Sequence, residues 1–446
     1  MLIAIPVFVL MGAILEKSRI AEDLLDTMGR SFGVLRGGLG ISVVLVGALL
    51  AASTGIVGAT VVAMGMIALP TMLRAGYNPA VASGIVCTAG TLGQIIPPST
   101  LLIILADVMS NAYQQAQYEQ GKFSVGQFFA AALLPGLLLV TLYLVYILIL
   151  GALRPSAMPP AETGPGRPDW REVMAAIAPP VLLIFAVLGA ILFGIATPTE
   201  AASVGAIGAL LMAGRKIGIN SRLILIGAAA LIGLGLLAGA FPVRLQRSDT
   251  GAADWALGGV YAVLALTGLA AVGLALRAAI RDRILHDALN STLTMTAMIF
   301  ATILAAGVFS LVFVGLGGEA RVAHLLDNLP GGPGGALLFV MIFVLGFFLD
   351  FVEISVIVLP LVAPSLIVMG HDPIWLGVLL AINLQTSFLT PPFGFSLFYL
   401  RAVAPGEIST GQIYRGVAPF IGVQAIGLAL IWAMPFLATW LPRVLF

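Results

Sequence analysis

Long apolar segments separated by short polar ones make up most of this 446-residue chain. Runs of about 20 apolar residues are long enough to cross a bilayer as helices. The pattern predicts spans or half-spans over 2–15, 38–50, 56–70, 78–94, 97–109, 127–150, 177–195, 200–214, 223–241, 256–276, 288–314, 336–348, 354–368, 374–389, 392–403 and 416–440. We therefore expect an all-α polytopic membrane protein.

Two pairs of apolar segments, 38–70 and 336–368, have arms too short for comfortable full crossings. Small or polar residues lie at their midpoints, Ser53-Thr54-Gly55 in the first pair and Asp350 and Glu353 in the second. Non-helical backbone is tolerated at membrane depth only where protein or a water-filled cavity surrounds it. We interpret both pairs as re-entrant helical hairpins.

The two halves of the chain share a pattern of glycine and proline. Five pairs of residues are separated by the same 294 positions: Pro70 and Pro364, Gly76 and Gly370, Pro79 and Pro373, Pro97 and Pro391, Pro98 and Pro392. Upstream, Gly37-Gly38 and Ser53 match Gly334-Gly335 and Asp350 at a separation of 297. The spacing predicts an internal repeat.

The distribution of basic residues orients the two repeats. If 16–36 is cytoplasmic, the predicted spans place 16 of the 21 Lys and Arg residues in cytoplasmic segments, as the positive-inside rule requires. The other five are Lys122, Arg244, Arg247, Arg321 and Arg443. This arrangement predicts repeats of opposite orientation, and inverted repeats with broken helices are a common design of secondary transporters.

Each half contains a predicted broken helix, with breaks at 90–99 and 385–394. A Pro-Pro pair removes two backbone donors and frees carbonyl groups on the preceding turn. Such carbonyls beside Ser and Thr hydroxyls suit sodium, because the chain has no Cys/His cluster for a transition metal. A pair of ordinary proline kinks is the alternative. The predicted sodium-binding residues are Ser53, Thr54, Gly55, Gly93, Ile96, Pro98, Asp350, Ser387, Thr390 and Pro392.

Other polar side chains near the breaks are candidates for a substrate cavity. Ionisable residues inside apolar segments usually face a cavity or a partner. For Asp350 we favour contact with a cation or substrate over structural pairing, and for Glu353 both stay open. Amide side chains there bind substrate or join helices. The predicted substrate-cavity residues are Ser53, Gln94, Asp350, Asn383 and Gln385.

Composition narrows the functional classes. Only 9% of residues are charged, against roughly 25% in soluble proteins, so most of the surface cannot face water. The net charge of +1 gives no indication of nucleic-acid binding. We find no Walker loop, nucleophile elbow or HExxH motif, and expect no catalytic residue, no ATP hydrolysis and no cofactor besides sodium ions. The single Cys87 excludes an internal disulfide framework.

Several motifs resemble one family. They are the run Ile5–Gly12, Arg36–Leu39, Gln94–Ser99, Gly194–Ala201 with its Thr-Pro-Thr-Glu-Ala sequence, and Leu389–Gly394. Together they resemble the large, DctM-type subunit of tripartite ATP-independent periplasmic (TRAP) transporters. Residues 346–353 with 385–390 are similar to the branch often labelled mannitol/chloroaromatic, which is associated with 2-oxo, lactate-like or aromatic acids.

The resemblance implies a sodium-driven elevator in the bacterial inner membrane that imports small organic acids. It also implies two partners, a small four-helix DctQ-type membrane subunit and a DctP-type periplasmic binding protein that delivers the substrate. Two alternatives remain open, a stand-alone sodium/anion symporter and a channel-like membrane scaffold protein.

The expected organisation has five parts. Residues 1–37 form a scaffold helix and amphipathic segment, 38–109 the first transport repeat, 110–335 scaffold helices with an extra helix pair at 217–276, 336–403 the second transport repeat, and 404–446 a C-terminal helix. A proline-rich linker at 154–171 separates the halves. The resemblance implies about two further helices before the Ile5–Gly12 run.

Overall fold

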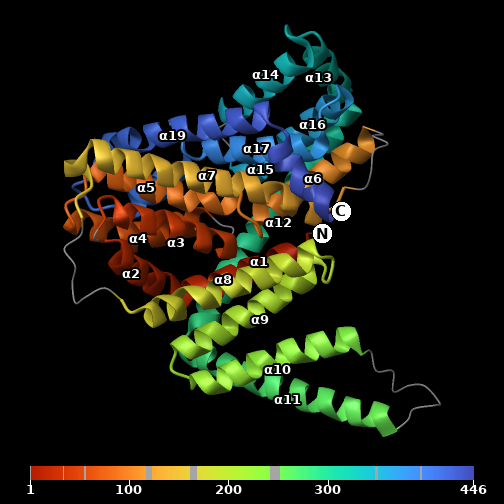
Figure 1. The fold of residues 1–446 in the computed structure, drawn as a ribbon. Helices are drawn as coiled ribbons and strands as arrows, with labels where there is room; N and C mark the ends of the chain where they lie inside the picture. Colours follow the sequence, from red (N-terminus) through yellow and green to blue (C-terminus); the bar gives the residue numbers. More distant parts are fainter. Residues whose placement is uncertain are drawn as a thin grey trace.

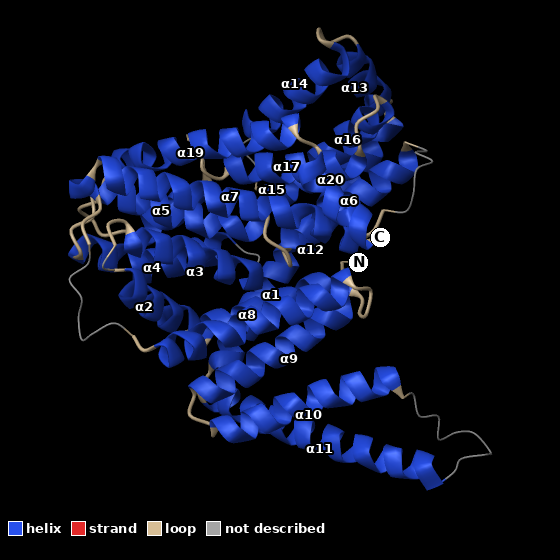
Figure 2. Cartoon of the chain, viewed as in Figure 1, coloured by secondary structure: helices blue, strands red, loops and turns tan. Residues whose placement is uncertain are grey.

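The chain is all-α, as its hydropathy predicts. The computed structural model describes residues 2–33, 35–54, 57–116, 123–160, 168–241, 252–346, 350–391 and 394–446, and within these ranges it contains helices and loops but no strand (Figure 2). Eight of the described helices are long and apolar enough to cross a membrane. The protein is therefore a multi-pass membrane protein.

The helices follow the predicted segments closely. The first part contains α1 (Ala4–Lys17), α2 (Ile20–Phe32), α3 (Gly38–Thr54), α4 (Val57–Arg74), α5 (Pro79–Thr91), η1 (Leu92–Gln94), α6 (Thr100–Gln115) and α7 (Val125–Leu153). The middle contains η2 (Pro155–Ala157), α8 (Trp170–Leu192), α9 (Pro198–Lys216), α10 (Ser221–Ala240), α11 (Ala252–Arg281), α12 (Ile284–Gly315) and α13 (Gly318–Asp327). The last part contains α14 (Gly332–Gly346), α15 (Phe351–Glu353), η3 (Ile354–Val358), α16 (Leu359–Val368), α17 (Pro373–Ser387), α18 (Phe395–Val403), α19 (Thr410–Ala433) and α20 (Phe436–Leu445).

Two details differ from the prediction. The predicted single span 416–440 is two helices, because Met434 leaves the helical conformation and Pro435 lacks the amide that would continue α19. The short helix α13, whose sequence is largely polar, was not predicted. It joins α14 at a bend of 119°.

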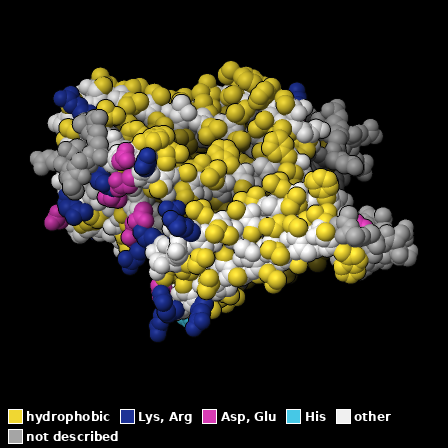
Figure 3. Space-filling model, turned by 60° about the horizontal axis from the view of Figure 1, so that its bottom comes forward, with side chains coloured by type: hydrophobic (Ala, Val, Ile, Leu, Met, Phe, Trp, Pro, Cys, Tyr) yellow, Lys and Arg dark blue, Asp and Glu magenta, His cyan; other side chains and the backbone are white. Residues whose placement is uncertain are grey.

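Helices from both halves lie together in the centre of the molecule. The helices α5, α7, α17 and α19 run side by side, with α19 in contact with the other three (Figure 1). The pair α3–α4 lies towards one end of this bundle, and α14 and α16 lie towards the other (Figure 1). Lys, Arg, Asp and Glu side chains gather mainly at the α3–α4 end, and a largely hydrophobic surface extends from there (Figure 3).

Glycine allows α5 and α19 to touch through their backbones. A Cβ atom added to Gly84 would lie 2.2 Å from the Gly416 carbonyl oxygen, and one added to Gly416 would lie 1.9 Å from the Ala80 carbonyl oxygen. Small residues at helix interfaces are the usual means of close packing in membranes. No larger side chain fits at either position without separating the two helices.

The helix pair α10–α11 projects from the rest of the molecule (Figure 1). The hydroxyl of Tyr261 on α11 lies 2.8 Å from the Leu237 carbonyl oxygen and 2.7 Å from that of Phe241, and its single proton is shared between them. This contact ties the far ends of the pair together. Many of its outward side chains, such as Leu236 and Leu266, are apolar and exposed. Such a surface suits lipid contact.

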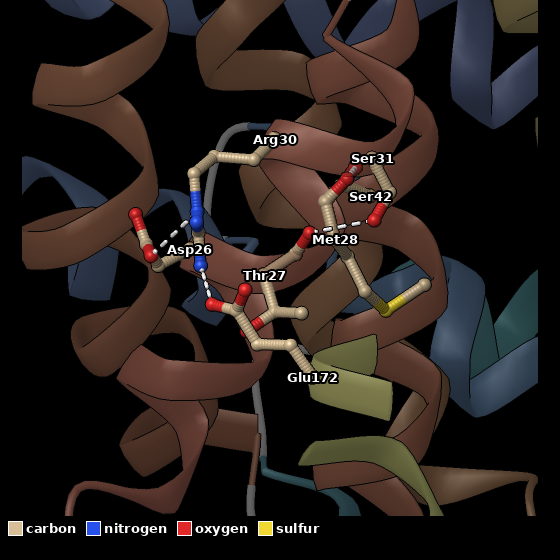
Figure 4. A network of polar contacts seen from close by, with 7 residues as sticks. All are labelled: Asp26, Thr27, Met28, Arg30, Ser31, Ser42 and Glu172. Carbon is tan, nitrogen blue, oxygen red and sulfur yellow. Dashed lines mark hydrogen bonds and ion pairs between the residues drawn. The ribbon is translucent and has the colours of Figure 1, made fainter. Parts of the chain in front are cut away.

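Ion pairs attach the amphipathic helix α2 to its neighbours. Arg30 pairs with Glu172 on α8 and with Asp26 one turn earlier on α2, the latter at 3.1 Å (Figure 4). The hydrogen bond that Arg30 donates to Glu172 raises the pKa of Arg30. Lys216 at the end of α9 pairs with Asp23. The helix α2 is therefore held at two points by the helices α8 and α9.

The helix α2 also contacts the first predicted hairpin. The buried hydroxyl of Ser42 on α3 lies 2.9 Å from the carbonyl oxygen of Met28 and donates to it (Figure 4). Beside this contact, α2, α3 and α4 surround a cavity of about 800 Å³. Its lining combines apolar side chains such as Val43 and Met72 with charged ones such as Glu22 and Arg74.

Candidate transport site

Two series of helices begin at residues that are separated by a constant 294 positions. The helices α3 and α14 begin at Gly38 and Gly332, α4 and α15 at Val57 and Phe351, and α5 and α17 at Pro79 and Pro373. Glycines with positive φ precede them at equivalent places, Gly37 with Gly331 and Gly76 with Gly370. Asn78 and Asp372 cap α5 and α17 through their side chains.

These boundaries correct the upstream match of the sequence analysis. Because α14 begins at Gly332, the counterparts of Gly37-Gly38 are Gly331-Gly332 rather than Gly334-Gly335. The same separation places Asp350 opposite position 56 and not opposite Ser53. The glycine-rich stretch Gly331–Gly335 offers two possible registers in sequence, and the positive φ angles distinguish them.

The first break follows α5. The helix tightens into η1 and ends at Gln94, and α6 begins at Thr100, beyond Pro97-Pro98. The hydroxyl of Ser99 donates to the Gln94 carbonyl oxygen over 2.8 Å and accepts from the Leu102 amide at 3.4 Å. One serine therefore binds backbone groups on both sides of this break.

The second break follows α17. Its helix ends at Ser387, and α18 begins at Phe395 after Gly394, which has a φ of +36°. The hydroxyl of Ser396 donates to the Phe388 carbonyl oxygen over 2.6 Å, and the Ser396 amide donates to the same oxygen at 3.2 Å. Phe388 is the counterpart of Gln94 at the 294-residue separation, so in both breaks a serine from the following segment binds the equivalent carbonyl.

Two predicted sodium ligands present hydroxyl oxygens at the second break. Ser387 donates to the Leu384 carbonyl oxygen over 2.6 Å, and Thr390 donates to that of Thr386 over 2.8 Å. Each hydroxyl thus uses its one proton within the helix end and keeps its lone pairs available. Both residues are half-buried, whereas Thr386 is buried. This donor set suits a hard cation.

At the first break the predicted ligands Gly93, Ile96 and Pro98 are buried. Both arms of the first predicted hairpin, α3 and α4, contact η1 beside them. The helix α3 includes Ser53 and Thr54 at its end, but their side chains, together with Gly55 and Pro392, lie outside the described residues. Their predicted contacts with sodium therefore stay predictions.

The carboxylates of the second predicted hairpin cap a helix start. Asp350 accepts from the Phe351 amide at 2.7 Å, and Glu353 accepts from the Asp350 amide at 2.6 Å. The two side chains form a capping box. Among the described residues neither makes an ion pair with Lys, Arg or His under a 4.0 Å limit. Asp350 therefore caps this helix start, the described residues do not show the structural pairing that was the alternative, and its contact with a cation or substrate stays a prediction.

The second predicted hairpin contacts the second break directly. The rings of Phe351 and Phe388 lie 5.9 Å apart. After Glu353 the helix widens into the π-helix η3, where the hydroxyl of Ser355 is buried without a hydrogen-bond partner among the described residues. Single π-turns inside helices are frequent at functional sites. Nothing in the hydropathy pattern indicated this one.

The three predicted amide residues are fully buried in this conformation. Asn383 donates to the Met341 carbonyl oxygen on α14 over 2.8 Å, and Gln385 donates to the Thr91 hydroxyl over 3.3 Å. Both side chains therefore join helices here. The amide of Gln94 has no partner among the described residues. It retains the full hydrogen-bonding capacity that a ligand or water would use.

Tyr399 on α18 is a site residue that the sequence analysis missed. Its ring lies against Gly58 at the start of α4, where an added Cβ would be 2.9 Å from the phenol carbon Cζ. It is also close enough to Asp350 and Glu353 to interact with them electrostatically. Tyr399 therefore lies between the two hairpins. A tyrosine within an apolar run gave no signal that it would hold this position.

Comparison with known proteins identifies one family over nearly the whole chain. The family described as "Tripartite ATP-independent periplasmic transporter, DctM component" matches residues 1–220 and 248–437. The C4-dicarboxylate TRAP transporter large permease protein DctM of Pseudomonas aeruginosa is 30% identical and covers 99% of this chain and 86% of its own length. The protein of the same name from Vibrio cholerae serotype O1 is 28% identical, with 100% and 86% covered.

A solved structure shares the fold at lower similarity. Neisseria gonorrhoeae MtrF, whose structure is described as illuminating a class of antimetabolite efflux pumps, aligns with a TM-score of 0.50 at 14% identity. The alignment covers 96% of this chain and 80% of that one. The gap between the two ranges of the family match, residues 221–247, contains α10. Only the first helix of the predicted extra pair is thus unmatched.

Proposed function

We propose, from the premise that this chain belongs to the DctM component family of tripartite ATP-independent periplasmic transporters, that it is the large permease of a sodium-coupled importer of small organic acids. The relatives above are named as transport permeases and not as enzymes. Both relatives are named as transporters of C4-dicarboxylates. For this chain we propose the wider class of small carboxylates, including 2-oxo, hydroxy and aromatic acids.

The observation that best supports sodium coupling is that a serine binds the equivalent carbonyl oxygen at both breaks. Gln94 and Phe388 lose helical partners for their carbonyl groups, and each carbonyl is bound by one serine, Ser99 or Ser396. This bracing holds two helix ends open in a buried environment. Beside the second, Ser387 and Thr390 offer hydroxyl lone pairs to a cation. Ordinary proline kinks would need neither feature.

The proposed mechanism is an elevator. The hairpins α3–α4 and α14–α16 lie towards opposite ends of the molecule, and each packs near one break (Figure 1). This placement supports inverted repeats, a design in which ions and substrate bind at the repeat interface. A cation bound between a hairpin and its break would stabilise the arrangement that holds substrate. It would thereby link the two affinities by population shift.

The proposed assembly has three components, in keeping with the family description as tripartite. A small four-helix membrane subunit would extend the scaffold, and a periplasmic binding protein would supply substrate. Since the binding protein would select the acid, the substrate preference of the system would not reside in this chain alone.

Reconstitution tests the proposal. The chain is placed in liposomes with its small subunit, a loaded binding protein and an inward sodium gradient, and uptake of radiolabelled small carboxylates is measured. We expect uptake only when all three proteins and sodium are present, because delivery and coupling are both required. Strong uptake by the isolated chain would instead identify a stand-alone symporter. Ohmic currents insensitive to the binding protein would identify a channel.

A further inference from the structure

One hydrogen bond joins the two broken helices at equivalent positions. The Gln385 side-chain amide Nε2 donates to Thr91 Oγ1 over 3.3 Å, and both side chains are fully buried. The two residues are 294 positions apart, the separation that also relates the first residues of α5 and α17. The bond therefore links the same point of each helix series to the other.

Both partners lie at the helix ends that lead into the breaks. Thr91 is the last residue of α5, and Gln385 lies in the final turn of α17, which ends at Ser387. The Thr91 hydroxyl also donates to the Thr88 carbonyl oxygen over 2.9 Å. A chain from amide to hydroxyl to carbonyl thus runs from α17 into α5. Unwinding or rotating either helix end would break it.

This contact is specific to the pair. Within the described part of the chain, it is the only side-chain hydrogen bond that directly joins α5 to α17. Loss of one partner would leave the other as an unpaired polar group in a buried setting, which is costly. The hydrogen bond therefore favours one relative position of the two helix ends. Because each break follows one of these ends, the bond also favours one relative position of the two breaks.

We propose that Thr91 and Gln385 are positioning residues that couple the two break sites. Their hydrogen bond makes the cation-bound arrangement of one helix end favour the bound arrangement of the other, so sodium binds cooperatively at the two breaks. This inference rests on the proposed function, because it concerns the sodium sites. Thr91 acts through the helix ends and contributes no ligand of its own.

Sodium titration of the full chain with its small subunit in nanodiscs tests this coupling. The readouts are the Hill coefficient and the midpoint, measured by isothermal titration calorimetry. Thr91→Val and Gln385→Met should each lower the coefficient towards 1 and raise the midpoint roughly twofold to tenfold, as expected for one hydrogen bond. Thr91→Ser keeps the hydroxyl and should match the unaltered chain.

Two further variants separate coupling from packing. Because the positions are equivalent, the double exchange Thr91→Gln with Gln385→Thr should restore cooperativity that each single change loses. Thr88→Val is the matched control, since this buried hydroxyl lies on the same helix but has no hydrogen-bond partner among the described residues. It should leave both readouts unchanged.

The outcomes also distinguish this inference from the proposed function. If Thr91→Val and Gln385→Met retain the original Hill coefficient while sodium still binds, the coupling is refuted and the transporter assignment stands. If the unaltered chain binds no sodium, both fall. Should Thr91→Val fail to give a monodisperse protein, Gln385→Met decides, together with the recovery or failure of the double exchange.

Discussion

At the scale of single residues, the three hydroxyl groups near the second break differ in whether their oxygen lone pairs are accessible. Thr386, Ser387 and Thr390 all donate to carbonyl oxygens one turn earlier. Thr386 is buried within α17, whereas the other two lie half-buried at its end. A sodium ion needs accessible oxygen lone pairs, so we expect Ser387 and Thr390, and not the buried Thr386, to serve as ligands.

Thr390→Ala should raise the sodium concentration for half-maximal uptake by roughly fivefold or more, the lower end of typical coupling between sites. The physical reason is the loss of one hard oxygen ligand at the second break. Uptake by the reconstituted complex is measured against sodium concentration, with protein amount checked by immunoblot. Thr386→Ala, which removes a buried hydroxyl four residues earlier, is the control and should leave the sodium dependence unchanged. Equal sodium dependence for Thr390→Ala and the unaltered protein would show that Thr390 is not a ligand.

The sequence predicted which residue types would surround the breaks but not how they would be paired. Side-chain oxygens at Ser387 and Thr390 were anticipated because they stand beside Pro391. The burial of Gln385 and Asn383 against other helices was not, since an amide in an apolar run has the same appearance whether it binds substrate or a neighbouring helix. The position of Tyr399 depends on α18 packing against α4, a long-range contact that no local pattern encodes.

At the scale of elements, local chemistry explains most helix boundaries. The specific Thr-Pro-Thr-Glu-Ala motif is a helix start, in which Thr197 and Glu200 form a capping box around Pro198 at the first helical turn. Ser124 with Gln127 and Ser409 with Gln412 begin α7 and α19 in the same way. Elements with such signals were predictable. The π-helix η3 was not, because nothing in the hydropathy pattern marks its widened turn.

The attachment of α2 can be tested by hydrogen–deuterium exchange. Glu172→Gln weakens the pair that Arg30 makes with α8 and should increase amide exchange across 20–32, while global unfolding changes little. Exposed ion pairs are typically worth about 0–1 kcal/mol, so an increase of up to roughly fivefold is expected. Glu22→Gln is the control, because among the described residues Glu22 makes an ion pair only with Arg19, three positions earlier, at 4.0 Å. Unchanged exchange in Glu172→Gln would mean that the Ser42–Met28 contact and packing alone hold α2.

At the scale of the whole molecule, the charged side chains gather towards one end. Charged side chains gather at the end where α3 and α4 lie (Figure 3), which the positive-inside rule places in the cytoplasm. The opposite end holds α13 and α14 (Figure 1). The basic-residue counts predict this orientation, and it stays a prediction. They could not predict how far α10 and α11 would stand away from the bundle.

Cysteine labelling checks the orientation directly. Single cysteines at Arg19 and Arg281 should react with an impermeant maleimide only from the cytoplasmic side, and those at Arg321 and Arg443 only from the periplasmic side. All four side chains are exposed. The native Cys87 is fully buried and should stay silent, so the unaltered chain is the blank. Labelling of all four positions from one side would contradict the opposite orientation of the two halves.

The backbone contact between α5 and α19 has a mechanical consequence. Gly84, Gly416 and Ala80 meet with no room for a methyl group, and Trp375 on α17 donates to the Ile431 carbonyl oxygen of α19 over 2.9 Å. Two helices that touch through their backbones, with no side chains or lipid tails between them, cannot slide past one another. If transport moves the broken helices, we expect α19 to move with them.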